Sequence, residues 1–273
     1  MEAQVNELSG GLGVSVSSRN KETMLLPEHI HDYFELYYLH QGSARHFVEN
    51  DIISLKHGEF VFIAQNAIHK TVYDAGKYSK RVLIDFTQDY IGEAYKDVLD
   101  ELGAKKYLSL PINWQPVAEE IILRLCKEYG GNEKLHAQLC RALLQELIIL
   151  LHRHAIHRKA AVLTETEQSI QSAAKYISEH YSDELNLSYL ATMYSMSNCY
   201  FSRTFKQFTG FGVSEYINII RIQQAEQMLC TGGLSVRQVA NACGFNDSNY
   251  FAAVFKRHKG ITPLKFSAMH KQV

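Results

Sequence analysis

The stretch G-F-N-D-S-N-Y-F-A-A-V-F-K-R-H-K-G-I-T-P, residues 244–263, decides the fold of the C-terminal part of the chain. Gly244 can adopt the positive φ of a sharp turn, and the Asp247 side chain can cap the start of a helix. Apolar and aromatic residues then recur at helical spacing, and the expected buried face consists of Tyr250, Phe251, Val254 and Phe255. The stretch therefore predicts a turn followed by a short helix with one buried and one exposed face.

The same pattern occurs fifty positions earlier in the chain. The positions that match at this spacing are Tyr200 with Tyr250, Phe201 with Phe251, Phe205 with Phe255, Lys206 with Lys256 and Gly210 with Gly260. Leu190 with Val239 and Ala191 with Ala240 match forty-nine positions apart. A repeat of this length, with two short helices in each copy, is typical of duplicated supersecondary units.

Each copy contains the parts of a helix-turn-helix motif. We expect Ser188 and Ser197 to cap the two helices of the first copy, and Ser235 and Asp247 to cap those of the second. A long helix over about residues 213–229 joins the copies and holds them at a fixed separation. In the first copy the expected inward residues are Tyr200, Phe201, Phe205 and Phe208.

The charge distribution separates this region from the rest of the chain. The net charge of the whole protein is −1, which is not typical of a nucleic-acid binder. From Gln168 to the end, ten Lys and Arg side chains face six Asp and Glu, so this part carries about +4 and the remainder about −5. A positive C-terminal part behind a negative N-terminal part indicates a DNA-binding module attached to another domain.

The N-terminal part has a strand-like pattern over about residues 14–86. Short β-prone runs alternate with turn residues, which predicts a small β-barrel or sandwich. Helical periodicity follows, with one helix ending near Gly130 and a longer one from Leu135 to about Ile156. Ile148 interrupts the polar side of the longer helix, so this helix needs two surfaces to pack against. One is its own barrel; for the other, the monomer core and a partner subunit both stay open.

The expected organisation is an α+β protein of four segments. Residues 1–110 form the β-barrel, residues 111–157 a helical dimerisation segment, residues 158–167 a basic linker, and residues 168–273 an all-α domain of two helix-turn-helix motifs. The five cysteines are scattered and contain no C-x-x-C pair, which argues against a disulfide framework or a cysteine zinc site. With no signal segment and no apolar run long enough to cross a membrane, the expected location is the cytoplasm.

The C-terminal residues resemble a known family. Residues 244–263, together with S-Y-L-A-T-M-Y-S-M-S-N-C-Y-F-S-R-T-F-K at 188–206 and R-I-Q-Q-A-E-Q-M-L at 221–229, resemble the signature of the AraC/XylS family of bacterial transcription regulators. The resemblance covers about residues 168–267. It implies a regulator, not an enzyme, that binds a double-stranded DNA operator, and that also contacts RNA polymerase if it is an activator.

The resemblance also implies which side chains contact DNA. In that family one subunit places both recognition helices in successive major-groove segments, about 34 Å apart. The corresponding outward residues here are Asn198, Cys199, Ser202, Arg203, Lys206, Ser248, Asn249, Ala253, Lys256 and Arg257. Arg203 is expected to pair with a guanine and Asn249 with an adenine, whereas Lys206, Lys256 and Arg257 are expected to meet phosphates.

Two departures from the family pattern affect this expectation. Ala253 stands where many members have Arg, so the second helix is expected to read fewer bases. Ser195 stands where Gly is common in the first turn, which costs less than about 1 kcal/mol.

The expected barrel carries a second group of polar residues. His29, His31 and Glu35, followed by Gly58 and His69, resemble the two motifs of a cupin barrel. His29, His31 and Glu35 have the same parity on an extended strand, so their side chains share one face, which we expect to line the inside of the barrel. Two or three histidines and one carboxylate can hold a divalent transition metal. Regulators of the AraC/XylS family often bind a small molecule there, frequently a sugar and without a catalytic metal. The expected ligand-binding residues are His29, His31, Glu35, Tyr37, His69 and Arg81.

Three hypotheses follow for the barrel. It is a sensor of a small polar effector, most readily a carbohydrate; a metal-binding cupin enzyme fused to a DNA-binding module; or a structural barrel without ligand. The resemblance favours the sensor, with no metal and no cofactor. The excess apolar surface on residues 135–156 predicts a homodimer through this helix pair. An architectural DNA-binding protein is disfavoured, because it would not need roughly 165 residues of barrel and helices.

Overall fold

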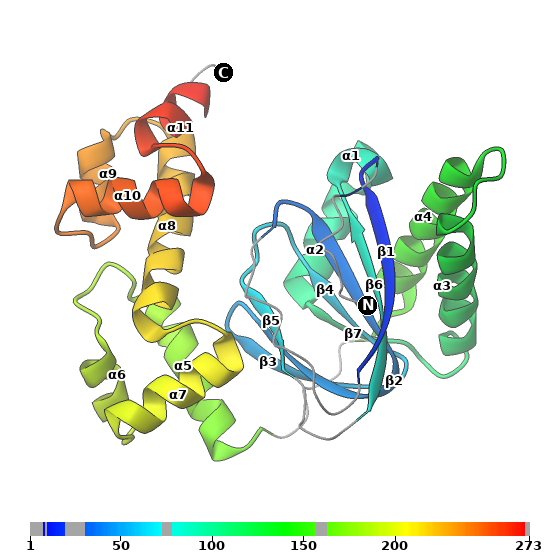
Figure 1. Ribbon diagram of the computed structural model, residues 1–273, viewed down its shortest axis with the longest axis horizontal. Helices are drawn as coiled ribbons and strands as arrows, with labels where there is room; N and C mark the ends of the chain where they lie inside the picture. Colours follow the sequence, from blue (N-terminus) through cyan, green and yellow to red (C-terminus); the bar gives the residue numbers. More distant parts are fainter. Residues whose placement is uncertain (1–7, 9, 20–30, 73–77, 157–162, 271–273) are drawn as a thin grey trace. The chain divides into compact units, whose positions relative to one another are not determined.

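The chain folds into two compact units, residues Met1–Leu163 and Thr164–Val273 (Figure 1). The computed structural model describes residues 8, 10–19, 31–72, 78–156 and 163–270. This division confirms the expected α+β class, with a β-sheet unit followed by a helical one.

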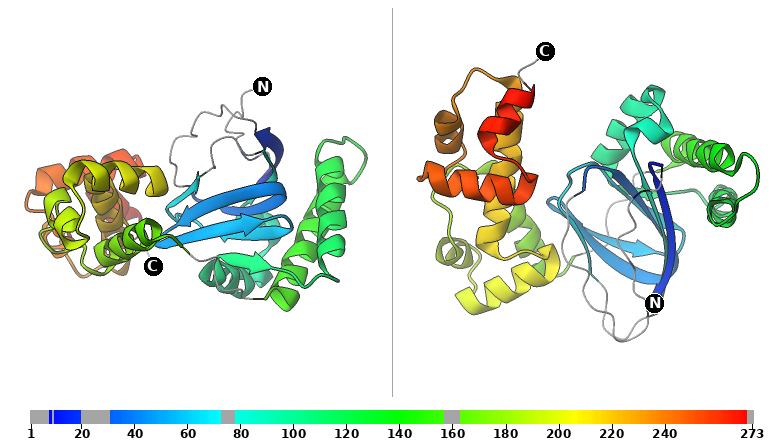
Figure 2. Two further views of the ribbon diagram at one scale, coloured as in Figure 1. Left: turned by 90° about the horizontal axis from the view of Figure 1, so that it is seen from below. Right: turned by 45° about the horizontal axis from the view of Figure 1, so that its top comes forward.

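The N-terminal unit is built from antiparallel strands that share one long central strand. The strands are β1 (Leu12–Arg19), β2 (Phe34–Val48), β3 (Asp51–Lys56), β4 (Glu59–Ile63), β5 (His69–Val72), β6 (Ser79–Phe86) and β7 (Tyr107–Ser109). The first half of β2 pairs with β4 and β6, and its second half pairs with β3 and β5. A register shift between Leu39 and Gln41 lies between the two halves, where an irregularity lets a strand bend from one sheet into another (Figure 2).

The first half of β2 has two buried faces with different partners. Leu36 and Tyr38 point toward the helices and join the larger hydrophobic core. Tyr37 and Leu39, at the alternate positions, point into the space between the two sheets, together with Val61 of β4. Because side chains alternate along a strand, Glu35 lies on the same inner face as Tyr37 and Leu39. The alternation along β2 therefore places this carboxylate between the two sheets.

Helices cover the outer face of this sheet. They are α1 (Gln88–Ile91), a 3-10 turn at Glu93–Tyr95, α2 (Lys96–Lys105), α3 (Gln115–Tyr129) and α4 (His136–His154). Residues 88–105, expected to belong to the barrel, are therefore mostly helical and pack beside it.

Of the two surfaces left open for Ile148, the monomer core and a partner subunit, the structure shows the monomer core. The Ile148 side chain is fully buried in the same core as Leu144 and Leu147, because α4 packs against α3, α1 and α2 within one chain. The apolar surface that suggested a partner subunit is thus covered by the protein's own helices and sheet.

Over residues 163–270, the C-terminal unit is built from helices. They are α5 (Glu165–Glu179), α6 (Leu187–Met193), α7 (Asn198–Thr209), α8 (Val213–Thr231), α9 (Val236–Ala242), α10 (Ser248–Lys259) and α11 (Pro263–His270). The central helix α8 contacts α5 and α7 as well as α9, α10 and α11. Its buried residues lie on more than one side because it packs against both helix-turn-helix motifs.

The helical unit begins earlier than the expected boundary at residue 168. Thr164 caps α5 and forms a capping box with Glu167, so the last residues of the expected linker are part of a helix. Residues 157–162 of that linker lie outside the described residues. Among the described residues, no helix combines the length and apolar composition that a membrane crossing requires.

Candidate functional site

The turns of the two helix-turn-helix motifs have the same geometry. In the first, the Met196 N–H donates to the Ala191 carbonyl at 2.9 Å, and Ser195 has a φ of 54°. In the second, the Phe245 N–H donates to the Ala240 carbonyl at 3.0 Å, and Gly244 has a φ of 79°. Both alanines are fully buried where the two helices of a motif meet. The repeat read from the sequence is therefore a repeat of backbone conformation.

Three of the four expected helix caps are present. Ser197 caps α7, Ser235 caps α9, and Asp247 caps α10. The expected cap at Ser188 is wrong: Asn186 caps α6 and accepts the Tyr189 N–H at 2.9 Å. Ser188 lies inside the first turn instead, because the helix begins at Leu187.

The second helix of each motif presents the expected residues on its outer side. On α7, Asn198, Cys199, Arg203 and Lys206 are exposed and Ser202 is half-buried; on α10, Asn249, Ala253, Lys256 and Arg257 are exposed and Ser248 is half-buried. Phe201 and Phe205 of α7, and Phe251 and Phe255 of α10, are fully buried beneath them. The two helices therefore carry polar and basic side chains on exposed surfaces.

Two tyrosines differ from the expectation. Tyr200 and Tyr250 were expected to be buried, but their side chains are 41% and 52% exposed. Each precedes a buried phenylalanine by one residue, which turns it about 100° away from the apolar face. The Tyr250 hydroxyl accepts a hydrogen bond from the Asn218 amide at 3.0 Å. Both tyrosines are exposed on the same two helices as the outward residues and are additional candidates for phosphate contacts.

A second group of polar residues lies inside the N-terminal unit. The Oε2 atom of Glu35 is 3.5 Å from Nε2 of His31 and 3.7 Å from Nε2 of His69. Arg81 is buried on β6, with its guanidinium 5.5 Å from the Tyr37 ring centre. The structure thus brings together His31, Glu35, Tyr37, His69 and Arg81, whereas His29 lies outside the described residues.

The two histidines are held by backbone carbonyls. His31 Nδ1 is 2.8 Å from the Tyr33 carbonyl, and His69 Nδ1 is 3.0 Å from the Ala67 carbonyl. Since a carbonyl only accepts, each Nδ1 carries a proton, and a neutral ring then turns the lone pair of Nε2 toward Glu35. The three facing atoms lie within 4.8 Å of one another, a set that suits a divalent transition metal.

The charges in this cluster favour an ionised Glu35. Burial raises the pKa of Glu35, but the hydrogen bond from His31 and the positive charges of His69 and Arg81 outweigh it and lower the pKa below its usual range. Burial alone would lower the pKa of His31. The hydrogen bond and the negative charge of Glu35 outweigh that effect, so the pKa of His31 lies above its usual value. A protonated His31 paired with Glu35 therefore competes with any metal ion for the same carboxylate.

Sequence reasoning missed two members of the cluster. Asp85 lies directly opposite Glu35 in the β2–β6 ladder, and burial together with the Glu35 charge raises the pKa of Asp85 to about 7. His46 is fully buried with its ring centre 4.2 Å from that of Tyr37, and burial lowers the pKa of His46 to about 3. The parity of Asp85 with Arg81 on one strand was the signal that could have found the first.

Comparison with known proteins assigns both units. A family model described as an AraC-like ligand binding domain matches residues 11–163, more than half of the chain, and one described as a helix-turn-helix domain matches residues 190–269. The chain belongs to the AraC family. It is a DNA-binding transcription regulator with an AraC-like ligand-binding domain, and not an enzyme.

Relatives of this AraC-family chain match over nearly its whole length. It is 27% identical to the HTH-type transcriptional activator RhaR of Yersinia pseudotuberculosis, over 96% of this chain and 91% of the relative. It is 25% identical to the HTH-type transcriptional activator RhaS of Klebsiella pneumoniae, over 87% and 86%. A solved structure of ToxT from Vibrio cholerae aligns at 15% identity with a TM-score of 0.38, over 97% of this chain and 99% of that one.

Proposed function

We propose that this regulator responds to a small polar effector, most readily a carbohydrate, bound in the N-terminal unit. The observation that carries the proposal is the buried cluster around Glu35, inside the domain that matches the AraC-like ligand binding family. A buried ion cluster is costly for a purely structural core, so the cluster argues against a structural barrel without ligand. Ligand sites combine apolar walls with a few convergent polar groups, and the inner surface of this unit has that composition.

The chemistry of the cluster suits hydroxyl groups. The carboxylates of Glu35 and Asp85 accept hydrogen bonds from hydroxyls, and Arg81 and the histidines donate them. Tyr37 adds an aromatic face beside these groups. A neutral polyol satisfies both kinds of partner without adding a charge to the buried site, which favours a sugar or sugar derivative over an anion or cation.

For DNA, the proposal assigns base reading to the N-terminal halves of α7 and α10 and phosphate contacts to the basic residues behind them. Arg203 and Asn249 read bases, and Lys206, Lys256 and Arg257 meet phosphates. The proposal also includes a cytoplasmic location, because the protein must reach its operator DNA there. Since relatives are named transcriptional activators, we extend the proposal to activation through contact with RNA polymerase.

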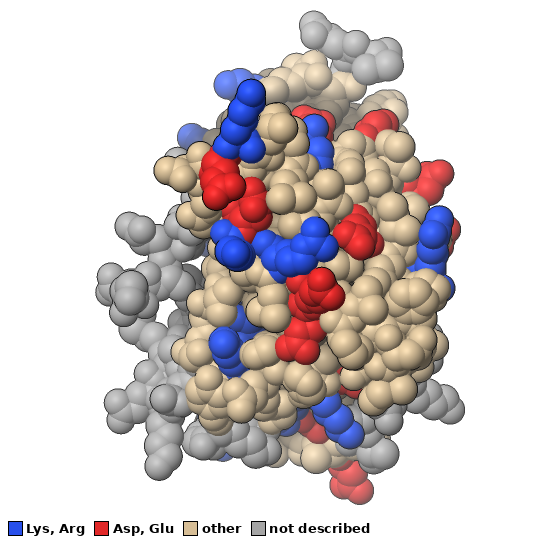
Figure 3. All heavy atoms as spheres, turned by 90° about the vertical axis from the view of Figure 1, so that its right-hand side faces the viewer, with Lys and Arg blue, Asp and Glu red and all other residues tan. Residues whose placement is uncertain are grey.

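The proposal includes a homodimer through the α3–α4 hairpin. Four apolar side chains there are 38–60% exposed: Val117, Leu123, Leu135 and Leu139. An open groove of about 420 Å³ lies along α4 beside Trp114 and His154, whose rings stack at 3.8 Å. The face formed by these helices intersperses Lys and Arg with Asp and Glu, between uncharged areas (Figure 3). Mixed charge around exposed apolar residues suits a self-complementary protein contact more than a DNA contact.

A thermal-shift screen of the full chain against carbohydrates tests the effector class, because a ligand that binds only the folded state raises the melting temperature. We expect a hit among sugars that is lost in Glu35→Gln. A hit unaffected by Glu35→Gln and by His69→Ala would contradict this site.

A second candidate is a metal-binding cluster, favoured by the Nε2 atoms of His31 and His69 facing Glu35. Elemental analysis of the purified protein, and melting with Zn²⁺, Mn²⁺ or Ni²⁺ before and after chelation, separates the two hypotheses. Stoichiometric metal that disappears in His69→Ala would support the metal site. A sugar response in chelated, metal-free protein would support the effector site as proposed.

A further inference from the structure

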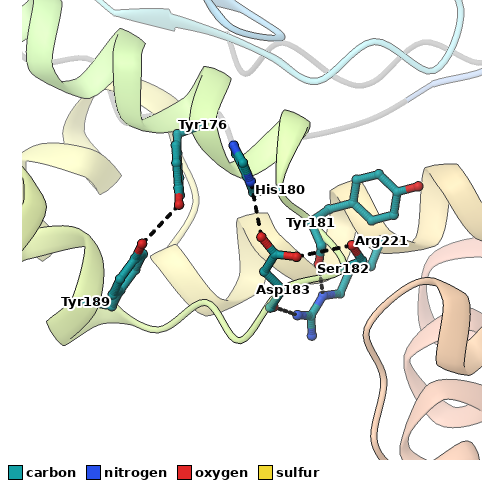
Figure 4. Close-up of polar contacts among 7 residues, drawn as sticks. All are labelled: Tyr176, His180, Tyr181, Ser182, Asp183, Tyr189 and Arg221. Carbon is teal, nitrogen blue, oxygen red and sulfur yellow. Dashed lines mark hydrogen bonds and ion pairs between the residues drawn. The ribbon is translucent and has the colours of Figure 1, made fainter.

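Arg221 lies on α8 between the two helix-turn-helix motifs and points into the loop that precedes the first (Figure 4). Its Nε donates to the Tyr181 carbonyl at 2.7 Å, and its Nη2 donates to the Asp183 carbonyl at 2.9 Å. The planar guanidinium thus bridges two carbonyls of the α5–α6 loop, which a single ammonium group would not do in the same geometry.

The same side chain also contacts the second motif. The Arg221 guanidinium lies 5.6 Å from the centre of the Phe245 ring, which follows Gly244 in the turn between α9 and α10. A Cβ atom at Gly244 would lie 2.7 Å from the Ser182 carbonyl oxygen and 3.0 Å from Nη2 of Arg221. Three segments distant in sequence therefore meet at one junction: the α5–α6 loop, the middle of α8, and the turn of the second motif.

Side chains hold the loop side of this junction. The His180 ring nitrogen Nδ1 is 3.1 Å from the Asp183 carboxylate, and the Tyr176 and Tyr189 hydroxyls are 3.0 Å apart (Figure 4). These contacts tie the loop to α5 at one end and tie α5 to α6 at the other. A shift of the loop relative to Arg221 would therefore carry the first motif with it.

The internal repeat supplies a control for the role of Gly244. The equivalent position in the first motif is Ser195, which adopts the same left-handed backbone conformation with a side chain present. The conformation alone therefore does not require glycine at this position. What excludes a side chain at Gly244 is the approach of Ser182 from the α5–α6 loop and of Arg221 from α8.

From this junction we propose that Arg221 is a positioning residue: with Gly244, it sets the separation and relative rotation of α7 and α10. The proposal rests on the proposed reading of DNA by these two helices. One base pair of extra spacing rotates the second major-groove segment by about 36° around the DNA axis. If the junction keeps α7 and α10 fixed, any change of spacing should therefore lower the affinity for DNA. A loosened junction lets the two motifs adapt to DNA in which the spacing of the two contacted segments is altered. It also lowers the affinity for DNA with the original spacing.

The test uses the full chain and a duplex that it selects from a random-sequence pool. Variants of that duplex have one or two base pairs inserted or removed between the two contacted segments. For the wild type we expect each change to weaken binding about tenfold or more, within the range of a lost base contact. In Arg221→Met the penalty should fall to about threefold or less, with weaker binding to the original duplex. Arg237→Met, an exposed arginine on α9, removes the same charge and should keep the wild-type penalty.

Three further variants keep the test decisive if Arg221→Met fails to fold. Arg221→Lys retains the charge but not the bridge, and should give an intermediate penalty. Gly244→Ser should change the preferred spacing, whereas Ser195→Gly should not. If the folded Arg221 variants weaken all duplexes equally and keep the full spacing penalty, the positioning role is wrong. A wild type that selects no sequence contradicts the DNA-reading proposal, and one that selects a sequence but tolerates every spacing contradicts the junction alone.

Discussion

At the residue scale, the backbone at Ser195 is the clearest strained position in the first motif. Its φ of 54° lies in the left-handed region, which costs a residue with a Cβ roughly 1–2 kcal/mol. Glycine removes this cost but loses more backbone entropy on folding. We expect Ser195→Gly to raise the free energy of unfolding by about 0.5–1 kcal/mol, measured by urea denaturation. A loss of stability would show that the Ser195 side chain makes a contact that outweighs the strain.

Arg203 and Lys256 should differ in how they contribute to DNA affinity. Arg203 is exposed on the outer side of α7, so Arg203→Ala should cost about 1–3 kcal/mol on the selected duplex and relax preference at one base pair. Lys256→Ala should weaken specific and random DNA alike and flatten the dependence of affinity on salt. Titrations at several salt concentrations separate the two effects. Equal weakening of specific and random DNA by Arg203→Ala would contradict base reading.

At the scale of elements, the features set by local rules were predictable from the sequence. The turn at Gly244 and the caps at Ser197, Ser235 and Asp247 depend on a few neighbouring residues, and all are present. The cap at Ser188 failed because Asn186, two residues earlier, offers an equivalent side-chain acceptor and starts the helix sooner. When two residues that can both cap a helix lie close together, capping propensity alone does not show at which of them the helix starts.

Features that depend on pairing between distant segments were not predictable. Asp85 joins Glu35 only through the register of β6 on β2, and a shift of one residue would turn either side chain to the other face. Ile148 appeared on the polar side of its helix, and only the packing of α4 among three other helices explains its burial. The same limit applies to His46, which lies on the second sheet, whereas the Tyr37 ring beside it comes from the first.

The α3–α4 hairpin is the element on which the dimer can be tested. Leu123 and Leu139 are 56% and 42% exposed, so Leu123→Glu or Leu139→Glu removes apolar contact area without disturbing the core. We expect the wild type to sediment as a dimer at tens of micromolar and these variants to shift toward monomer. Leu264→Glu, at a 72% exposed leucine on α11, should leave the dimer intact. A monomeric wild type, with and without ligand, would contradict the proposed interface.

At the scale of the whole molecule, the proposed effector acts by preferring one arrangement of the two units over another. It need not change the fold of either unit, and the response cannot exceed its differential affinity for the two arrangements. A coupling of about 1–3 kcal/mol would change operator affinity roughly 5- to 150-fold. The two compact units, Met1–Leu163 and Thr164–Val273, give such a coupling a physical basis, because each keeps its own core.

This coupling predicts a specific separation of effects in the Glu35 cluster. Glu35→Gln removes the charge that faces His31 and His69, and His69→Ala removes one of its partners, so both should abolish the response to the sugar found by screening. Operator affinity without the sugar should stay within about twofold of the wild type, because the DNA-reading helices belong to the other unit. Glu120→Gln, at an exposed carboxylate on α3, controls for the loss of a negative charge and should respond normally. Operator titrations of each full-length variant, with and without the sugar, decide the matter: a normal response in both Glu35→Gln and His69→Ala would place the effector elsewhere in the molecule.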